Sequence, residues 1–205
     1  TDYRWRGISA SAGDFAIQGG LTISHSSGFY ASVWASSLED SEALGSTEVD
    51  FNGGWTGELA PSLKADVGMY LYHYPNGNAG PADFFEPYAS LSTDVGPINA
   101  KIGAAYSWKQ ASLGDEDNLY IYSEFQTSVG DTPLSLTAHI GYTDGALSPN
   151  RLTEASEKGA LDYWAGASYN VYDNIYISAT YVGVGGNSIK GYSNDTVIGS
   201  IKYLF

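Results

Sequence analysis

The chain has 205 residues, of which 43% are hydrophobic and 16% are charged, and its formal net charge is −14. Such an acidic chain is a poor partner for nucleic acid, whose phosphates need Lys and Arg. The absence of cysteine excludes disulfide scaffolds, cysteine nucleophiles and thiolate metal sites. No run approaches the roughly 18 consecutive apolar residues that a membrane helix needs, and the length suits a single domain over residues 1–205.

Apolar and polar residues alternate with a period of two along the whole chain, which predicts an all-β fold. In one of the clearest segments, Leu63, Val67 and Leu71 alternate with Lys64 and Asp66. No segment has the sustained spacing of a helix. In chain order, the predicted strands cover residues 2–9, 15–25, 28–38, 47–58, 62–73, 84–94, 97–109, 118–129, 133–143, 159–171, 174–183 and 192–205.

The connectors between these strands alternate between looser loops and tight turns. The loops cover residues 10–14, 39–46, 75–83, 110–118, 144–158 and 184–191, and the turns cover 26–28, 59–62, 94–97, 130–133 and 172–174. Long loops at one end and short turns at the other are typical of outer-membrane barrels. We therefore expect a transmembrane antiparallel up-and-down β-barrel of about 12 strands, in which the first strand pairs with the last through Trp5 and the region 201–203.

This topology makes further predictions about placement. An even number of strands puts both termini at the short-turn end, which is periplasmic in a bacterial outer membrane, and residues 144–158 become the longest external loop. The alternative is a soluble β-sandwich or a lipocalin-like barrel, in which the apolar face points inward. In that case the alternation of loops and turns would be accidental.

Aromatic residues on the predicted lipid face fall near the strand ends, as in the interface girdles of membrane barrels. We expect Phe15, Phe85, Trp108, Tyr142, Tyr163 and Tyr181 at the long-loop end, and Trp5, Phe29, Tyr169, Tyr203 and Phe205 at the short-turn end.

The two ends of the sequence carry features of their own. The last strand closes with Ile201, Tyr203 and Phe205, and Tyr203 and Phe205 are similar to the C-terminal signal that the barrel-assembly machinery reads. Read without that similarity, this is an ordinary last strand that ends in Phe. The sequence begins inside a predicted strand, so we expect that a signal peptide and a few mature residues precede it. Outer-membrane lipid and lipopolysaccharide are the further expected partners.

The N-terminal third resembles the TorF-type porin family, also described as a conserved outer-membrane family of unknown function. The resemblance rests on "DYRWRGIS" at 2–9, "AIQGGLTISHSSGFYASVWAS" at 16–36 and "EVDFNGGWTGEL" at 48–59. The rest of the chain is similar only in its barrel character and its terminal signal. The resemblance implies a Gram-negative outer-membrane barrel with a pore, and it assigns no residue to catalysis.

The face opposite the lipid stripe supplies the predicted lumen. Its charged members either pair and fill the barrel as a salt-bridge network or guide solutes. Arg4 and Arg6 would lie beside Lys202 after closure, giving a basic strip opposite the acidic strands. We predict that the pore is lined by Arg4, Arg6, Glu48, Asp50, Asp66, Glu86, Lys101, Glu124, His139 and Asp162.

The loops are also acidic, and they include Glu39, Asp40, Glu42, Asp115, Glu116, Asp117, Glu154 and Glu157. The segment "GDEDN" offers carboxylates to calcium, yet it lacks the spacing of a calcium loop, and charge runs are usually solvated surface. We predict no metal and no cofactor.

The function predicted from these features is passive diffusion of small solutes or ions through a narrow pore with mild cation preference. One alternative is a plugged structural or adhesion-type barrel, since Tyr70, Tyr72, Tyr88, Tyr120, Tyr122, Trp164 and Tyr176 are candidates to constrict the lumen. The other is a lipid hydrolase, which needs a His with a serine or carboxylate partner. His139 beside Glu124 is the candidate pair, and the prediction is that the protein is not an enzyme.

Overall fold

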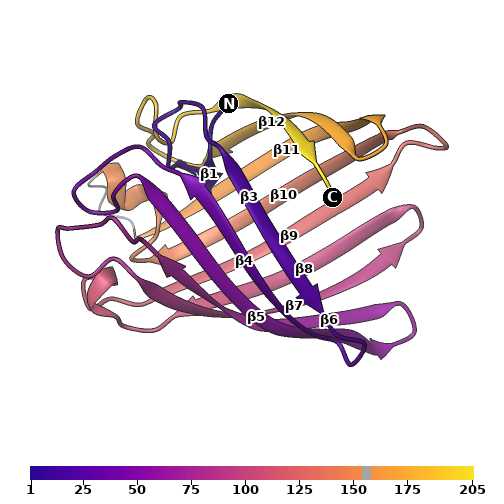
Figure 1. Cartoon of the computed structure of the whole chain (residues 1–205), viewed down its shortest axis with the longest axis horizontal. Helices are drawn as coiled ribbons and strands as arrows, with labels where there is room; N and C mark the ends of the chain where they lie inside the picture. The colour runs from indigo at the N-terminus through magenta and orange to yellow at the C-terminus, as the bar shows by residue number, and fades with distance from the viewer. Residues whose placement is uncertain (154–157) are drawn as a thin grey trace.

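The computed structural model describes residues 1–153 and 158–205, and within them strands dominate (Figure 1). A single antiparallel sheet joins eleven strands in chain order. These are β3 (Gln18–Ser24), β4 (Phe29–Ser37), β5 (Thr47–Ala60), β6 (Leu63–His73), β7 (Phe84–Val95), β8 (Ile98–Ser107), β9 (Asn118–Ser128), β10 (Leu134–Gly145), β11 (Gly159–Tyr172), β12 (Ile175–Val184) and β13 (Thr196–Tyr203). A separate small sheet pairs β1 (Arg4–Trp5) with β2 (Ile8–Ser9), and the short 3₁₀ helices are η1 (Ala111–Leu113) and η2 (Pro149–Thr153).

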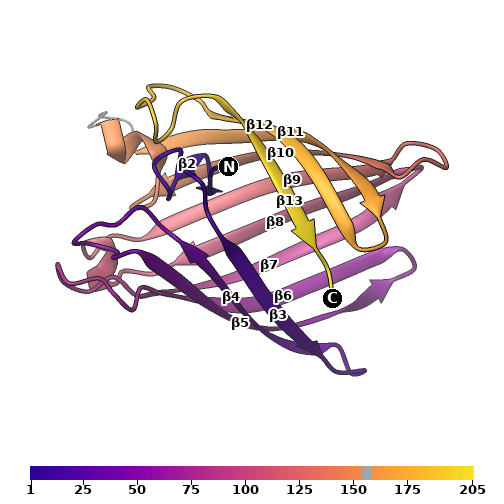
Figure 2. The ribbon, with the colours of Figure 1, turned by 45° about the horizontal axis from the view of Figure 1, so that its top comes forward.

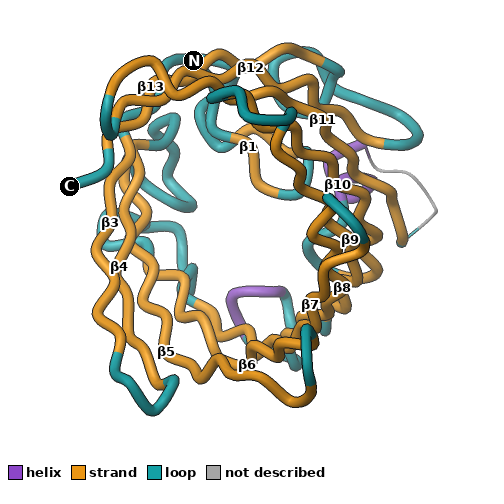
Figure 3. The backbone as a smooth tube through the Cα atoms, turned by 90° about the vertical axis from the view of Figure 1, so that its right-hand side faces the viewer, coloured by secondary structure: helices purple, strands orange, loops and turns teal. Residues whose placement is uncertain are grey.

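The large sheet curls into a ring around an interior space (Figure 3). Each strand pairs with its neighbour in the chain, and the two outermost strands, β3 and β13, are not paired with each other. Because eleven strands alternate in direction, β3 and β13 run the same way (Figure 2). The described sheet is therefore not closed, and eleven of the twelve predicted strands belong to it.

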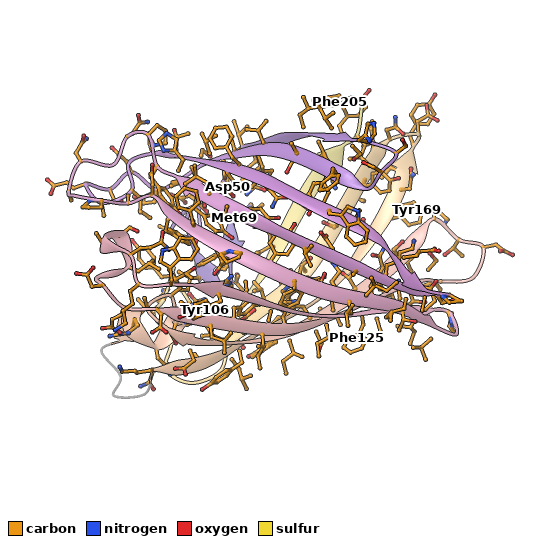
Figure 4. All side chains as sticks on the ribbon, turned by 90° about the horizontal axis from the view of Figure 1, so that it is seen from below. Asp50, Met69, Tyr106, Phe125, Tyr169 and Phe205 are labelled. Carbon is orange, nitrogen blue, oxygen red and sulfur yellow. The ribbon has the colours of Figure 1, made fainter. Side chains whose placement is uncertain are left out.

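Apolar and polar side chains are distributed as in a membrane barrel, with apolar groups outside and polar groups inside. On β10, Ile140 is 48% exposed and points outward, whereas His139 and Thr143 are buried on the inner face. The same holds elsewhere, since Glu86 is buried on β7 while the Phe125 side chain of β9 lies outside the ribbon (Figure 4). Apolar outside and polar inside is the reverse of a soluble β-barrel, and it is the arrangement that lipid requires.

The connectors follow the predicted alternation. The longer ones, at residues 38–46, 74–83, 108–117, 146–158 and 185–195, lie at one end, and the turns at 25–28, 61–62, 96–97, 129–133 and 173–174 lie at the other. The predicted external loop 144–158 includes residues 154–157, so Glu154 and Glu157 lie outside the described residues. In the described part of the chain, no helix has the length and apolar character to cross a membrane.

The first predicted strand, 2–9, is not part of the wall, and this prediction is wrong. The chain reverses at Arg6 and Gly7, which have φ values of 49° and 79°, as a two-residue type I′ turn requires. Trp5 consequently pairs with Ile8 and does not pair with residues 201–203, and β13 pairs only with β12. The resulting hairpin lies inside the ring (Figure 3).

The aromatic residues predicted for the girdles are exposed, with two exceptions. Trp5 packs inside, with its ring centroid 5.6 Å from that of Tyr72, so its girdle assignment is wrong. Tyr163 is only partly exposed, and its hydroxyl donates to Asp195 at 3.2 Å. The exposed members are Phe15, Phe85, Trp108, Tyr142, Tyr181, Phe29, Tyr169, Tyr203 and Phe205.

Candidate functional site

The N-terminal hairpin, residues 2–9, is bound to the inner wall of the barrel at the loop end. Arg4 Nη1 donates to the carbonyl oxygen of Asn194 at 2.9 Å, and the backbone N–H of Ser9 donates to the carbonyl of Tyr192 at 2.6 Å. On the opposite side of the lumen, Arg6 Nη2 donates to Glu86 Oε2 at 2.5 Å. The hairpin therefore crosses the lumen from the 185–195 connector to β7.

Close packing against the wall depends on Gly7. A Cβ atom at this position would lie 2.3 Å from Val184 Cγ1 and 3.3 Å from Asp162 Cβ, and the first of these distances is one that real side chains do not adopt. Glycine also tolerates the positive φ of the turn. Glycine is therefore required in the Arg-Gly turn for two reasons, the backbone conformation and the lack of space for a Cβ atom.

The hairpin covers a chamber of about 580 Å³ in the middle of the barrel. Eight of the ten side chains predicted for the lumen line this chamber, namely Arg4, Arg6, Asp66, Glu86, Lys101, Glu124, His139 and Asp162. Glu48 instead lines a second cavity at the loop end. Asp50 lines neither of these two spaces, although it is buried on the same inner face of β5.

Most charges in the chamber form pairs. Arg6 and Glu86 form a buried ion pair, and Lys101 Nζ lies 3.0 Å from Glu124 Oε2. His139 Nε2 lies 3.2 Å from Asp162 Oδ1. The predicted alternative, in which the charged lumen residues pair in a salt-bridge network, therefore holds for most of the charged side chains of the chamber.

Asp66 and Asp162 have no Lys or Arg partner within 4.0 Å among the ion pairs of the described residues. Asp66 Oδ1 accepts a hydrogen bond from the Tyr30 hydroxyl at 2.7 Å. The Tyr120 hydroxyl lies 3.2 Å from Asp162 Oδ1. The Lys, Arg, Asp and Glu side chains that line the chamber comprise three cations and four anions, which leaves a residual charge of −1.

Aromatic side chains form the rest of the lining. On one side, Tyr70 stacks on Tyr72 with 5.5 Å between ring centroids. On the other, Tyr122, His139 and Trp164 continue as a stack, with 5.3 Å between the last two rings. Six of the seven predicted aromatic constrictors line the chamber, namely Tyr70, Tyr72, Tyr88, Tyr120, Tyr122 and Trp164, and Tyr176 does not.

Sequence reasoning missed several chamber residues, among them Tyr30 and Asn52. The strand alternation that puts Phe29 outside and Asp50 inside was sufficient to find these two. One predicted feature was misplaced. The predicted basic strip does not form. Lys202 pairs with Tyr176 next to the turn at 173–174, whereas Arg4 is held at the loop end with the hairpin.

Outside the strands of the sheet, the connector 74–83 is closed by Asp83. Its carboxylate accepts a hydrogen bond from the backbone N–H of Tyr74 at 2.9 Å and lies 2.6 Å from His73 Nδ1. Partial burial acts to raise the pKa of Asp83, but these two hydrogen bonds outweigh it, and the pKa is lowered. Burial, followed by the nearby charges of Glu48 and Asp50, raises the pKa of Tyr74.

The structure brings the predicted pair His139 and Glu124 together, and no histidine of the described residues contacts both a serine and a carboxylate. His139 Nε2 contacts the hydroxyl of Tyr120 at 2.7 Å, and its other nitrogen lies 3.5 Å from Glu124. His25 meets Ser27 Oγ at 2.7 Å in an exposed short turn, and His73 pairs with Asp83. The one histidine with a serine partner has no carboxylate among its hydrogen-bond partners in this part of the chain.

Comparison with known proteins gives a family and a fold. A family model described as "Bacterial protein of unknown function (Gcw_chp)" matches residues 1–201. No curated protein matches the sequence. The fold is similar to that of the NanC porin, with a TM-score of 0.66, 15% identity and 93% of both chains covered. It is similar as well to the KdgM porin, solved in complex with disordered oligogalacturonate, with a TM-score of 0.66, 10% identity and coverage of 93% of this chain and 92% of that one.

These comparisons leave the functional assignment to the site itself. The matching family is one of unknown function, so the TorF-type resemblance stays a prediction. At 10–15% identity, the likeness to the two porins concerns the fold.

Proposed function

Because the chain belongs to the Gcw_chp family of bacterial proteins of unknown function, we propose its activity from its own lumen: an outer-membrane channel for passive diffusion of small solutes or ions. The observation that carries this proposal is the polar chamber of about 580 Å³ inside a sheet with an apolar exterior. A lipid-facing exterior around a polar interior is what an aqueous pathway needs. The porin fold of the two structural neighbours supports it.

Completion of the wall to about 12 strands is part of this proposal. Direct pairing of β3 with β13 would be parallel, and open sheet edges are not tolerated in hydrocarbon. One further antiparallel strand between them satisfies both edges. Thr1 already bonds to both backbone groups of Gly199 on the free edge of β13, at 2.7 and 3.1 Å.

The proposed orientation follows from the position of the longer loops at one end of the barrel and the turns at the other. We place the longer loops outside the cell, facing lipopolysaccharide, and the turns together with the C-terminus in the periplasm, as in other barrels of this class. The predicted periplasmic N-terminus does not follow from the described strands, because the N-terminal hairpin is held at the loop end.

A mild preference for cations is the finer proposal. Asp66 and Asp162 remain in the chamber without a Lys or Arg partner, and the loops 39–42 and 115–117 add further carboxylates at the mouth. Negative charge at a pore mouth raises the local concentration of cations. Paired Arg6 and Lys101 keep the preference weak.

Reversal potentials in planar bilayers under a salt gradient test selectivity. We expect Asp66→Asn to reduce the cation preference, and Glu124→Gln to reduce it further, because that change also leaves Lys101 unpaired. The contribution of the loops should fall between 0.1 M and 1 M salt, as the screening length shrinks from about 10 Å to about 3 Å. Clear anion preference in the parent protein would contradict the charge argument.

A plugged structural or adhesion-type barrel is the second candidate. It is favoured by the hairpin itself, which is held by ion pairs and hydrogen bonds on two sides of the lumen. A parent protein that conducts no ions, including after release of the hairpin, would favour this candidate over the channel.

A further inference from the structure

A second cavity lies at the loop end, on the other side of the hairpin from the chamber. Its volume is about 370 Å³. The hairpin side chains Tyr3 and Trp5 line it together with Tyr74 and Phe84 from the wall, and the remaining lining is largely aliphatic. Two charged side chains also line it: Arg151, which pairs with Glu116, and Glu48, which has no cationic partner among the described residues.

Glu48 belongs to a buried acidic pair. Glu48 and Asp50 are on the same face of β5, two residues apart, and they are 4% and 8% exposed. The Tyr74 hydroxyl donates to Glu48 Oε1 at 3.1 Å. One oxygen of Asp50, Oδ1, is buried without a hydrogen-bond partner. Asp50 is labelled in Figure 4, in the half of the barrel nearer the loops.

No cationic side chain neutralises this pair. All nine Lys and Arg residues fall within the described residues, and none lies within 4.0 Å of either carboxylate. Arg4 and Arg6 on the hairpin pair with Asp2 and Glu86, and Arg151, which lines the same cavity, pairs with Glu116. Two adjacent buried carboxylates without a cation are costly, so a positive charge from outside the chain would be bound favourably.

We propose that this cavity binds an organic ammonium ion with an apolar body. The carboxylate of Glu48, which lines the cavity, holds the cationic head through a charge-assisted hydrogen bond. Asp50 beside it adds negative charge without touching the ligand. The rings of Tyr3, Trp5 and Tyr74 contact the head and the body, as aromatic faces do with organic cations. A hydrated divalent ion is a poor fit, because it needs six or more oxygen ligands and the walls are mostly carbon.

This site goes beyond the proposed channel function and does not depend on it. A ligand in the cavity contacts the hairpin and the loops, above the chamber, so its binding is measurable whether or not ions pass. Binding is therefore tested separately from conductance, and failure of one does not imply failure of the other.

Isothermal titration calorimetry on the full chain in detergent micelles tests the site, with phenethylammonium chloride as probe and 2-phenylethanol as its neutral counterpart. Micelles without protein provide the blank for partitioning. We expect saturable binding of the ammonium ion and about tenfold weaker binding of the alcohol. Glu48→Gln and Asp50→Asn should each reduce this preference, and the double variant should abolish it.

The matched control is Glu39→Gln, which removes an exposed loop carboxylate and should leave the affinity unchanged. Ala43→Phe places a ring in the cavity that Ala43 lines and should weaken both probes with the carboxylates intact. Equal affinity for the two probes, no binding of the ammonium ion, or an unchanged preference in the double variant would each overturn the proposal.

Discussion

At the scale of single residues, the lumen is organised by charges that have little water around them. Arg6 and Glu86 are the main example, because their side chains are 6% and 2% exposed. The Arg6 guanidinium also lies over the Tyr120 ring, 4.0 Å from its centroid. Removing one member of such a pair leaves a buried charge without compensation, which typically costs about 3–5 kcal/mol.

We therefore expect Arg6→Ala to release the hairpin from β7 and to raise the single-channel conductance. The double variant Arg6→Ala/Glu86→Gln removes both charges and should restore much of the barrel's stability, while the hairpin stays loose. Lys190→Ala, which removes an exposed cation, is the control. If Arg6→Ala conducts like the parent, the hairpin does not limit the pathway.

Asp83 has a pH dependence that follows from its lowered pKa. A carboxyl whose pKa is depressed by folding stabilises the structure above its unfolded pKa, about 3.9, and this contribution is lost as the pH falls through the folded pKa. Pepsin cleavage beside Tyr74 or Phe84, the aromatic residues at the two ends of the connector, should therefore increase only in strong acid in the parent protein. Asp83→Asn should be cleaved more readily already at about pH 4. Equal cleavage of the two proteins at that pH would show that Asp83 does not hold this loop closed.

At the scale of elements, the hairpin is where close backbone packing matters most. Its turn occupies a space next to Val184 that admits no Cβ atom at Gly7. Gly13 has a similar φ of +85°, but a Cβ atom there would have no neighbour closer than 3.6 Å. The two glycines therefore separate the steric requirement from the conformational one.

We expect Gly7→Ala to displace the hairpin and Gly13→Ala to leave it in place. Because the chain has no cysteine, a Ser9→Cys background reports the position of the hairpin through maleimide labelling, since Ser9 is only 4% exposed. Labelling should be slow in that background and in its Gly13→Ala version, and fast with Gly7→Ala. Adding Val184→Ala to the Gly7→Ala variant should slow the labelling again, because the smaller side chain leaves space for the Cβ atom at position 7. Equal labelling rates for the two glycine variants would refute the steric explanation.

At the scale of the whole molecule, the exterior of the barrel is apolar, and the terminal Phe205 side chain adds little to the packing of the barrel. Phe205 is 92% exposed, and its ring contacts that of Tyr203, at 6.4 Å between centroids. A residue this exposed can be removed without opening a cavity. The assembly-signal role predicted for Phe205 is therefore separable from folding stability.

Deletion of Phe205 should slow barrel assembly in cells while leaving the thermal stability of protein refolded in detergent unchanged. Heat-modifiable mobility after pulse labelling measures the first quantity, and the unfolding temperature of the refolded protein measures the second. Truncation of the exposed Leu204 side chain to Ala, one residue earlier, is the matched control. Normal assembly kinetics without Phe205 would contradict the predicted signal.

The local features of this protein could be predicted from its sequence. Period-two alternation located the eleven strands of the sheet, and it assigned their inner and outer faces, because a strand turns successive side chains to opposite sides whatever the fold around it. Connector lengths determined which ends hold the loops. The chamber side chains Asp66, Glu124 and His139 followed from that alternation alone.

What fills the interior depends on tertiary contacts between residues that are far apart in the sequence. Residues 2–9 alternate like a wall strand, and whether they pair with β13 or fold back at Arg6 and Gly7 depends on contacts with Glu86 and Val184, far away in the sequence. The unpaired state of Glu48 and Asp50 is likewise a property of the assembled lumen, because charge pairing depends on distance in space. Alternation carries no information about such distances, so the hairpin and the two cavities could not be predicted from it.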